Sequence, residues 1–279
     1  MKEIRFLRAV LFALITVLAI SACEKQNDDQ TELPDEQLAS SHAIAEAIFD
    51  EVSIISDHAF RLGSGETKAY ADECPLLNNC ATVTIHTTVM PHMMTIDFGE
   101  ENCLCGDGKW RRGQIIVTFT GPYHQSGTVI THGFNDYYVN DNHVEGSRTM
   151  TNLGPNEDGH PEYETVVDGT ITLNNNQGVI SWQADRLRTW VEGYTTPMWY
   201  DDVFLITGSG SHSHSNGNGF TRTILIPLRK ELSCHHFVSG VVRTVPENKP
   251  VRTLDYGDGA CDNIAMLTMG NKTFVIQLN

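Results

Sequence analysis

Hydrophobic and polar positions divide the chain into three stretches with different periods. Residues 9–20 form an unbroken apolar run behind a basic start. Residues 36–60 carry apolar side chains at spacings near three and four, the period of an amphipathic helix. From Cys80 onward, short runs alternate apolar and polar side chains, which is the period of β-strands.

The alternation after Cys80 predicts antiparallel strands. Ile115, Val117 and Phe119 share one face of such a run, and Gly270-Asn271 predicts the two-residue turn of a hairpin. No long helical period separates the runs, whereas parallel strands would need such crossovers. We therefore predict a mainly β fold, an antiparallel sandwich or a long curved sheet, preceded by one N-terminal helix.

Two segments near opposite ends of the β region repeat one pattern. Thr95–Gly99 reads TIDFG and Thr253–Gly257 reads TLDYG, and in both a cysteine lies six residues after the aspartate. The equal offset of Cys103 and Cys261 favours two related β units, one opening and one closing the domain, over a chance match.

The N-terminal run has the features of a targeting segment. Its basic start and short apolar stretch suit a signal peptide better than a membrane-spanning helix. It ends in Ile20-Ser21-Ala22-Cys23, which resembles the lipobox of bacterial lipoproteins. That resemblance implies cleavage before Cys23 and its modification by fatty-acyl chains, which anchor a protein when two or more are present. An ordinary secretory signal with a chance cysteine is the alternative.

The residues after Cys23 bear on location and organisation. A short acidic tract there resembles the surface-export signal of Bacteroidota lipoproteins, and it also suits a solvated tether. We expect a lipid-anchored protein of the outer membrane, periplasmic or surface-exposed, with the membrane as a partner. The predicted segments are a signal peptide at 1–22, a tether at 23–35, a helix at 36–60, a linker at 61–79 and a β domain at 80–279.

The other cysteines predict disulfides, because their number is even and the chain is exported. They are Cys74, Cys80, Cys103, Cys105, Cys234 and Cys261. If each repeated unit is closed on itself, Cys234 pairs with Cys261, and Cys80 pairs with Cys103 or Cys105. Cys74 then takes the remaining one. Metal binding by Cys103 and Cys105 is the alternative, with a spacing unlike that of zinc ribbons.

Charge excludes one class of function. The 279 residues contain 19 Lys and Arg against 35 Asp and Glu, a formal net charge of −16. A nucleic-acid-binding protein needs a basic face, so no nucleic acid is expected as a partner. Docking on anionic lipid through a polybasic patch is disfavoured for the same reason.

Histidine and aspartate clusters are the candidates for a metal site. Residues 208–219 read GSGSHSHSNGNG, where His212 and His214 would face the same way on an extended segment, and His235-His236 is a second pair. Asp255 and Asp258 offer oxygen ligands to Ca²⁺. The alternatives are a mobile polar loop at 208–219 and plain turns at the aspartates. Beyond Ca²⁺ or a transition metal at these places, no cofactor is predicted.

A ligand site is suggested by one strand. Trp190, Arg186 and Arg188 alternate onto a single face, where a half-exposed tryptophan could stack on a glycan. Cross-strand packing is the alternative explanation. The nucleophile elbow, zincin, phosphate-loop and EF-hand motifs are all absent. Asp201-Asp202 does not form a hydrolytic pair, since adjacent strand residues point to opposite faces.

Several segments together resemble a family of uncharacterised Bacteroidota lipoproteins. They are Thr95–Gly99, Arg111–Thr118, Tyr137–Asn140, Val144–Thr149, Leu254–Gly259 and Cys261–Asn263. The resemblance extends over most of residues 80–279 and implies no activity.

Three functions fit these observations. The first is a non-enzymatic envelope lipoprotein, either structural or binding a glycan or protein partner, which the absence of catalytic motifs favours. The second is a surface hydrolase acting on polysaccharide or peptide. The third is metal capture by the His-rich segment.

Overall fold

The computed structural model describes residues 36–64, 77, 80–196 and 198–278. Residues Gln37–Asn279 form one compact unit, which holds the strands and nearly all of the helix. The predicted signal peptide, Cys23 and the tether lie outside the described residues, as does Cys74. In the described ranges, no helix has the length and apolarity needed to cross a bilayer.

Helix α2 (Glu36–Ser64) follows from the amphipathic period. Ala45, Phe49 and Val52 are buried on one side, whereas Ile54 on the other side is 51% exposed. The helix continues past the predicted end at residue 60 and stops in a glycine-rich segment, where helices commonly terminate.

The rest of the unit is built from strands and two short 3₁₀ turns, η1 (Asn174–Asn176) and η2 (Trp199–Asp201). The strands are β1 (Thr82–His86), β2 (His92–Asp97), β3 (Cys103–Leu104), β4 (Trp110–Phe119), β5 (Val129–Val139), β6 (Asn142–Pro155), β7 (Pro161–Thr172), β8 (Val179–Glu192), β9 (Val203–His214), β10 (Gly219–Glu231), β11 (Ser239–Pro246), β12 (Arg252–Asp258), β13 (Ile264–Met269) and β14 (Lys272–Gln277).

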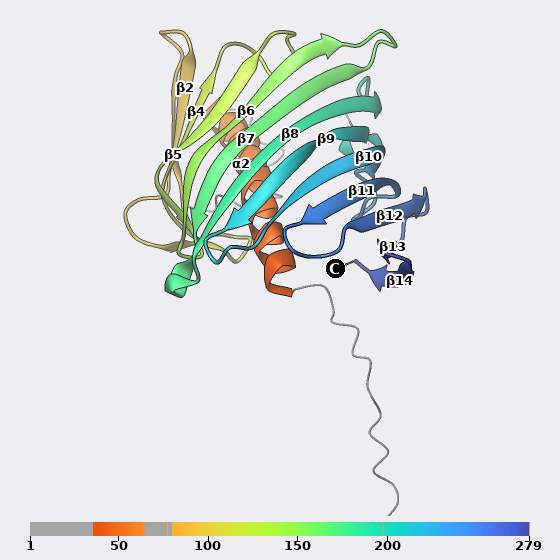
Figure 1. The fold of residues 1–279 in the computed structure, drawn as a ribbon. Helices are drawn as coiled ribbons and strands as arrows, with labels where there is room; N and C mark the ends of the chain where they lie inside the picture. The colour runs from red at the N-terminus through yellow and green to blue at the C-terminus, as the bar shows by residue number, and fades with distance from the viewer. Residues whose placement is uncertain (1–35, 65–76, 78–79, 197, 279) are drawn as a thin grey trace, which may run out of the picture. The chain divides into compact units, whose positions relative to one another are not determined.

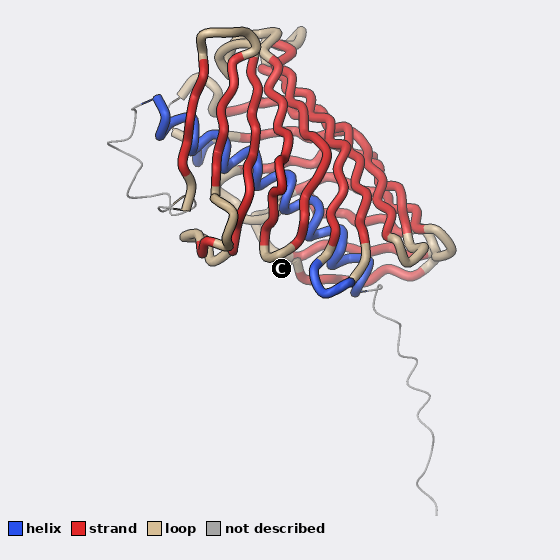
Figure 2. Tube along the Cα trace, turned by 90° about the vertical axis from the view of Figure 1, so that its left-hand side faces the viewer, coloured by secondary structure: helices blue, strands red, loops and turns tan. Residues whose placement is uncertain are grey.

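These strands make one open, 14-stranded antiparallel sheet in which sequence neighbours pair in space, with the short β3 lying beside β4. Figures 1 and 2 show the sheet curving around α2, which crosses the strands obliquely. The predicted mainly β fold with one N-terminal helix is confirmed, as a single sheet and not as a sandwich. The predicted Gly270-Asn271 turn joins β13 to β14, where Met269 pairs with Lys272.

The main apolar core lies between α2 and the inner face of the sheet. Phe49 and Ile55 of α2 join one buried cluster with residues of β2 to β8, among them Ile96, Val144 and Ile180. A Cβ added at Gly169 on β7 would overlap the Phe49 ring. Glycine at this position therefore lets the helix approach the sheet closely.

A smaller cluster covers the C-terminal strands. Leu228, Val242 and Tyr256 are its buried members, and Phe237 and Leu254 pack against it. The inner face of the sheet thus has a second apolar region, formed mainly by side chains of β9 to β12.

Two disulfides close two hairpins. Cys80 is bonded to Cys103 around β1 and β2, and Cys234 is bonded to Cys261 around β11 and β12. Both pairs agree with the sequence prediction. Cys105 has a free, buried thiol, so the expected third pair is not formed at this residue.

The repeated pattern has the same local geometry in both hairpins. Asp97 Oδ1 accepts a hydrogen bond from the backbone N–H of Gly99 at 2.8 Å. Asp255 Oδ1 accepts one from the N–H of Gly257 at 2.9 Å. The aromatic residue between them, Phe98 or Tyr256, is buried in each case.

The expected polar loop at residues 208–219 is wrong. Strand β9 continues to His214 and β10 begins at Gly219, which leaves a turn of four residues. The Ser-His alternation supplies the two-residue period of a strand, with His212 and His214 buried. A Cβ at Gly208 would overlap the carbonyl oxygen of Asp185 on β8, so glycine permits the strands to pair here.

Candidate functional site

The two predicted histidine pairs form separate places in the fold. His212 and His214 share one buried face near the end of β9, as the alternation predicts, whereas His235-His236 lies in the β10–β11 connection. The intervening β10 has 13 residues, which at about 3.3 Å per residue separates the two pairs by roughly 40 Å. Across the described part of the chain, no group of three or more His, Cys, Asp or Glu side chains could hold a metal ion.

The aspartates proposed for Ca²⁺ are structural or exposed. Asp255 accepts the Gly257 hydrogen bond described above. Asp258 was expected in a turn, but it is the last residue of β12 and pairs with Ser239 of β11. This expectation is therefore wrong, because the strand extends through Gly257.

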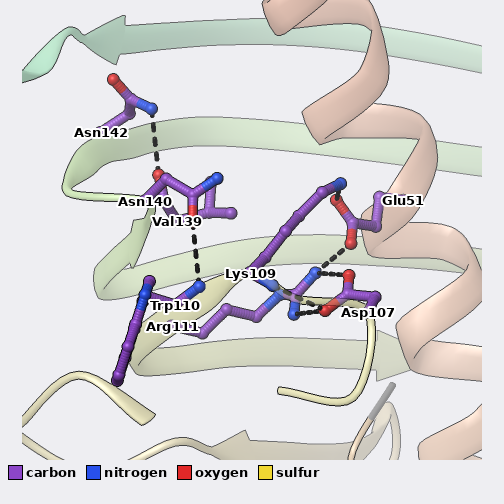
Figure 3. Close-up of polar contacts among 8 residues, drawn as sticks. All are labelled: Glu51, Asp107, Lys109, Trp110, Arg111, Val139, Asn140 and Asn142. Atoms are coloured by element: carbon purple, nitrogen blue, oxygen red, sulfur yellow. Dashed lines mark hydrogen bonds and ion pairs between the residues drawn. The ribbon is translucent and has the colours of Figure 1, made fainter. Parts of the chain in front are cut away.

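A buried ionic cluster connects α2 to β4 (Figure 3). The Arg111 side chain is 0% exposed, and it donates hydrogen bonds from Nη1 and Nη2 to the two carboxylate oxygens of Asp107 at 2.8 and 2.6 Å. Arg111 also pairs with Glu51 of the helix. Lys109 Nζ lies 2.6 Å from the other Glu51 oxygen. Since carboxylates of the chain itself pair with both cations, we assign the cluster to holding the helix on the sheet.

The pKa values in this cluster follow from burial and pairing. Burial alone would raise the pKa of Asp107, but its hydrogen bonds with Arg111 and Glu51 hold it well below the usual range. Burial raises the pKa of Glu51, against the lowering effect of Lys109 and Arg111. The carboxylate of Asp107 is therefore the strongest anionic partner of Arg111.

A second group of side chains, which we call the strand-end cluster, lies where β7 begins, β8 ends and β9 begins. It consists of Tyr123, Tyr163, Arg188, Trp190, Tyr194 and Phe204. Tyr123 stacks on Tyr163 with ring centroids 5.2 Å apart. Trp190 packs against Phe204 at 5.4 Å and meets Tyr194 edge-on at 6.3 Å.

Arg188 connects the aromatic rings of this cluster. Its guanidinium carbon lies 4.7 Å from the centroid of Phe204 and 5.5 Å from that of Tyr163. Its Nη2 donates a hydrogen bond to the Tyr123 hydroxyl at 2.8 Å. Cation–π contacts and a hydrogen bond thus fix the arginine among the rings.

The cluster lies on the same face of the sheet as α2. Arg188 and Trp190 are an even number of residues from Ile180 and Trp182 of the core, in an unbroken strand. Arg188 also pairs directly with Tyr163 across β7 and β8. Tyr194 is 37% exposed, and Tyr123 and Trp190 are half-buried. Part of the aromatic surface therefore reaches solvent.

Polar groups border these rings. Trp190 Nε1 donates to Asp202 Oδ1 at 3.2 Å, and burial raises the pKa of Asp202. Asp201 accepts from Thr196 instead, so the two adjacent aspartates do not act as a pair. Thr189 donates to Glu162 at 3.0 Å, but this pair is one residue out of phase with Arg188 and Tyr163 and so lies on the opposite face of the sheet. Asp202 is thus the carboxylate that holds the edge of the Trp190 ring.

Arg148 on β6 and His132 on β5 lie on the same inner face of the sheet as the cluster. The two residues pair across β5 and β6, and both are buried. Burial and the neighbouring Arg148 charge lower the pKa of His132 to about 3. Burial also lowers the pKa of Arg148, and the Asp50 charge opposes this shift while Arg188 adds to it. A guanidinium stays protonated in proteins, so the inner face carries a buried positive charge here.

Sequence reasoning found only part of this arrangement. The alternation correctly placed Arg186, Arg188 and Trp190 on one half-buried face. It missed Tyr123 and Arg148. The signal for Arg148 was present in β6, where it takes an inward position in line with Val144.

Comparisons with protein-family models, with curated proteins and with solved structures gave no match. The chemistry of the strand-end cluster is therefore the guide to function. Partly exposed rings beside hydrogen-bonding groups can stack on the apolar face of a ligand and bind its polar edge.

Proposed function

We propose that this chain is a non-enzymatic lipoprotein of the bacterial outer membrane that binds a carbohydrate at the strand-end cluster. The observation that carries the binding role is the group of partly exposed rings of Tyr123, Trp190 and Tyr194, which border the buried rings of Tyr163 and Phe204 that pack against Arg188. A sugar ring offers C–H faces that pack on aromatic rings and hydroxyl groups that bind polar side chains.

The envelope location is supported by different features. The Ile20–Cys23 segment has the lipobox pattern, and the two disulfides are typical of proteins that fold in an oxidising compartment. Membership of the Bacteroidota lipoprotein family is part of the same proposal. We also infer that the two disulfide-closed hairpins are related units, since pattern and local geometry coincide.

Lipidation at Cys23 is tested by the mass of the mature protein. We expect an N-terminal peptide that begins at Cys23 and carries a diacylglyceryl group and an amide-linked fatty acid, and partition of the protein into membranes. Cys23→Ser should release the protein from the membrane fraction. An unmodified N-terminal residue on the native protein would refute the anchor.

Carbohydrate binding is tested through Tyr194, whose exposure allows replacement without disturbing the core. After an oligosaccharide array identifies a ligand, Tyr194→Ala should weaken its binding by about tenfold, or about 1.4 kcal/mol. Tyr200→Ala is the matched control, since Tyr200 is 52% exposed in the same β8–β9 connection and bonds to Met198. Titration calorimetry on both variants measures the difference.

Two results would contradict the proposal. Equal affinities of Tyr194→Ala and the unchanged protein would remove the strand-end cluster as the site. Release of reducing ends from the bound oligosaccharide would favour the surface hydrolase instead. Metal capture, the remaining alternative, gains no support from the described residues.

A further inference from the structure

Arg148 is the least satisfied charged group on the inner face. Its side chain belongs to a residue that is 7% exposed. Its Nε and Nη1 atoms are buried and have no hydrogen-bond acceptor in the described part of the chain. A buried donor without an acceptor is costly and uncommon in native proteins, and bound water or an ion is a frequent explanation.

The surroundings of Arg148 do not neutralise it. Asp50 of α2 is the acidic group whose charge acts on it, and Asp50 is exposed. Arg188 adds a like charge, and Tyr123 and the neutral His132 are the other titratable groups that face it. In contrast, Arg111 in the ionic cluster meets two carboxylates directly.

Arg148 and Arg188 lie on the same inner face at different depths. Arg148 is buried on β6, whereas Arg188 on β8 is half-buried between the buried rings of Tyr163 and Phe204 and bonds to the partly exposed Tyr123. The charge of Arg188 is also one of the causes that lower the pKa of Arg148. A planar anion can accept paired hydrogen bonds from a guanidinium group, so this region suits a carboxylate.

We infer that Arg148 and Arg188 form an anion subsite of the strand-end cluster, and that the ligand is a sugar carrying a carboxylate, such as a uronic acid. This inference rests on the proposed carbohydrate-binding function and specifies its ligand class. The rings bind the sugar ring, and the arginines bind its acidic substituent.

The charge of the whole protein narrows the ligand further. With a formal net charge of −16, the surface repels long polyanions. A single acidic residue in an otherwise neutral oligosaccharide avoids most of that repulsion and still satisfies Arg148. The inference is therefore a terminal or isolated acidic sugar, not a polyuronate.

The test compares methyl glucuronide with methyl glucoside, using calorimetry on the full mature protein. The unchanged protein should bind the glucuronide more tightly. Arg148→Met should weaken glucuronide binding by about 10- to 100-fold, the size expected for lost charged hydrogen bonds, with glucoside binding unchanged. Arg148→Lys, which keeps the charge and loses the planar donor pair, should give an intermediate affinity. Arg243→Met is the control, because Arg243 is exposed on β11 and the charge change is identical.

Stability gives an independent readout. Removing an unsatisfied buried charge should leave the unfolding temperature of Arg148→Met at or above that of the unchanged protein. If Arg148→Met fails to fold, Arg148→Lys alone decides the matter through its glucuronide affinity. Glucose 6-sulfate is the second anionic probe, and tighter binding of the sulfate than of the glucuronide would overturn the carboxylate assignment.

Different results would refute the anion subsite and the carbohydrate-binding function. Equal affinity of the unchanged protein for glucuronide and glucoside, with Tyr194→Ala weakening both, would overturn the anion subsite and leave carbohydrate binding intact. Unaltered glucuronide affinity in Arg148→Met would do the same. Absence of binding by any array glycan or either probe would overturn both.

Discussion

Replacing Arg111 with alanine is expected to lower the free energy of unfolding by about 3–5 kcal/mol, the cost of breaking a buried ion pair. The side chain is fully buried and meets carboxylates of Glu51 and Asp107. Its removal leaves these two acids with only Lys109 as a cationic partner, and Lys109 contacts Glu51. Chemical denaturation followed by circular dichroism measures the change.

Arg112→Ala is the matched control for this substitution. Arg112 is the next residue on β4, and it pairs with Asp141, whose side chain is 55% exposed. An exposed pair of this kind contributes less than about 1 kcal/mol. A loss for Arg111→Ala no larger than that for Arg112→Ala would contradict the structural role of the cluster.

A triple replacement separates the charge from the packing. Arg111→Met with Glu51→Met and Asp107→Leu removes the buried guanidinium together with both carboxylates that pair with it. Apolar replacement of a whole buried ionic group is often neutral or stabilising. We therefore expect the triple variant to be more stable than Arg111→Ala, since no buried carboxylate is left without Arg111, and Lys109, which loses Glu51, has a side chain 37% exposed to solvent.

The Arg111 cluster also marks what the sequence could not predict. Glu51 lies 60 residues before Arg111, and no local period connects a residue of the helix to a residue of β4. The strands themselves were predictable, because alternation such as Ile115, Val117 and Phe119 identifies one buried face. Long-range polar pairs depend on how the sheet curves over the helix, which alternation does not encode.

The glycine-rich stretch at 208–219 shows a second limit. Its composition is typical of a flexible loop, and that prediction was wrong because Gly208 and Gly210 serve close strand pairing. Arg148, for which no role was predicted, shows the converse limit. A charged residue in an alternating strand is usually assigned to solvent, yet this one takes an inward position. Both limits arise where local composition and tertiary packing disagree.

The disulfide pairs could be predicted because the repeat supplied a rule. Equal offsets of Cys103 and Cys261 from their aspartates suggested that each unit closes on itself, and both bonds form in that way. The choice between Cys103 and Cys105 stayed open at the sequence level. Pairing of Cys103 with Arg111 on β4 fixes β3 in the sheet, and Cys105 lies beyond the end of that strand.

Acidification from pH 6.5 to pH 4 is expected to lower the free energy of unfolding steeply, and His132 is the main cause. Burial and then the charge of Arg148 lower the pKa of His132 to about 3 in the folded protein. In the unfolded chain its pKa returns to about 6.5, so in this range the unfolded state binds the extra proton. Stability therefore falls as the pH falls, by about 1.4 kcal/mol per pH unit for each such histidine.

His212 adds to this slope over the same range. Burial and the neighbouring His214 lower its pKa to about 4. Asp202 and Glu51 act in the opposite sense, since burial raises the pKa of each carboxyl and the folded state takes up a proton first on acidification. The measured pH dependence of the free energy of unfolding is therefore the contribution of the two histidines minus that of the two carboxyl groups.

Denaturant unfolding at several pH values, for the unchanged protein and for His132→Gln, isolates the contribution of His132. We expect His132→Gln to reduce the slope by about 1.4 kcal/mol per pH unit, whereas His86→Gln, on an exposed position of β1, should leave it unchanged. Arg148→Met should also flatten the profile, because loss of the Arg148 charge removes one of the two causes that keep His132 neutral. Equal slopes in Arg148→Met and the unchanged protein would mean that burial alone sets the pKa of His132, and that Arg148 acts on the histidine too weakly to matter.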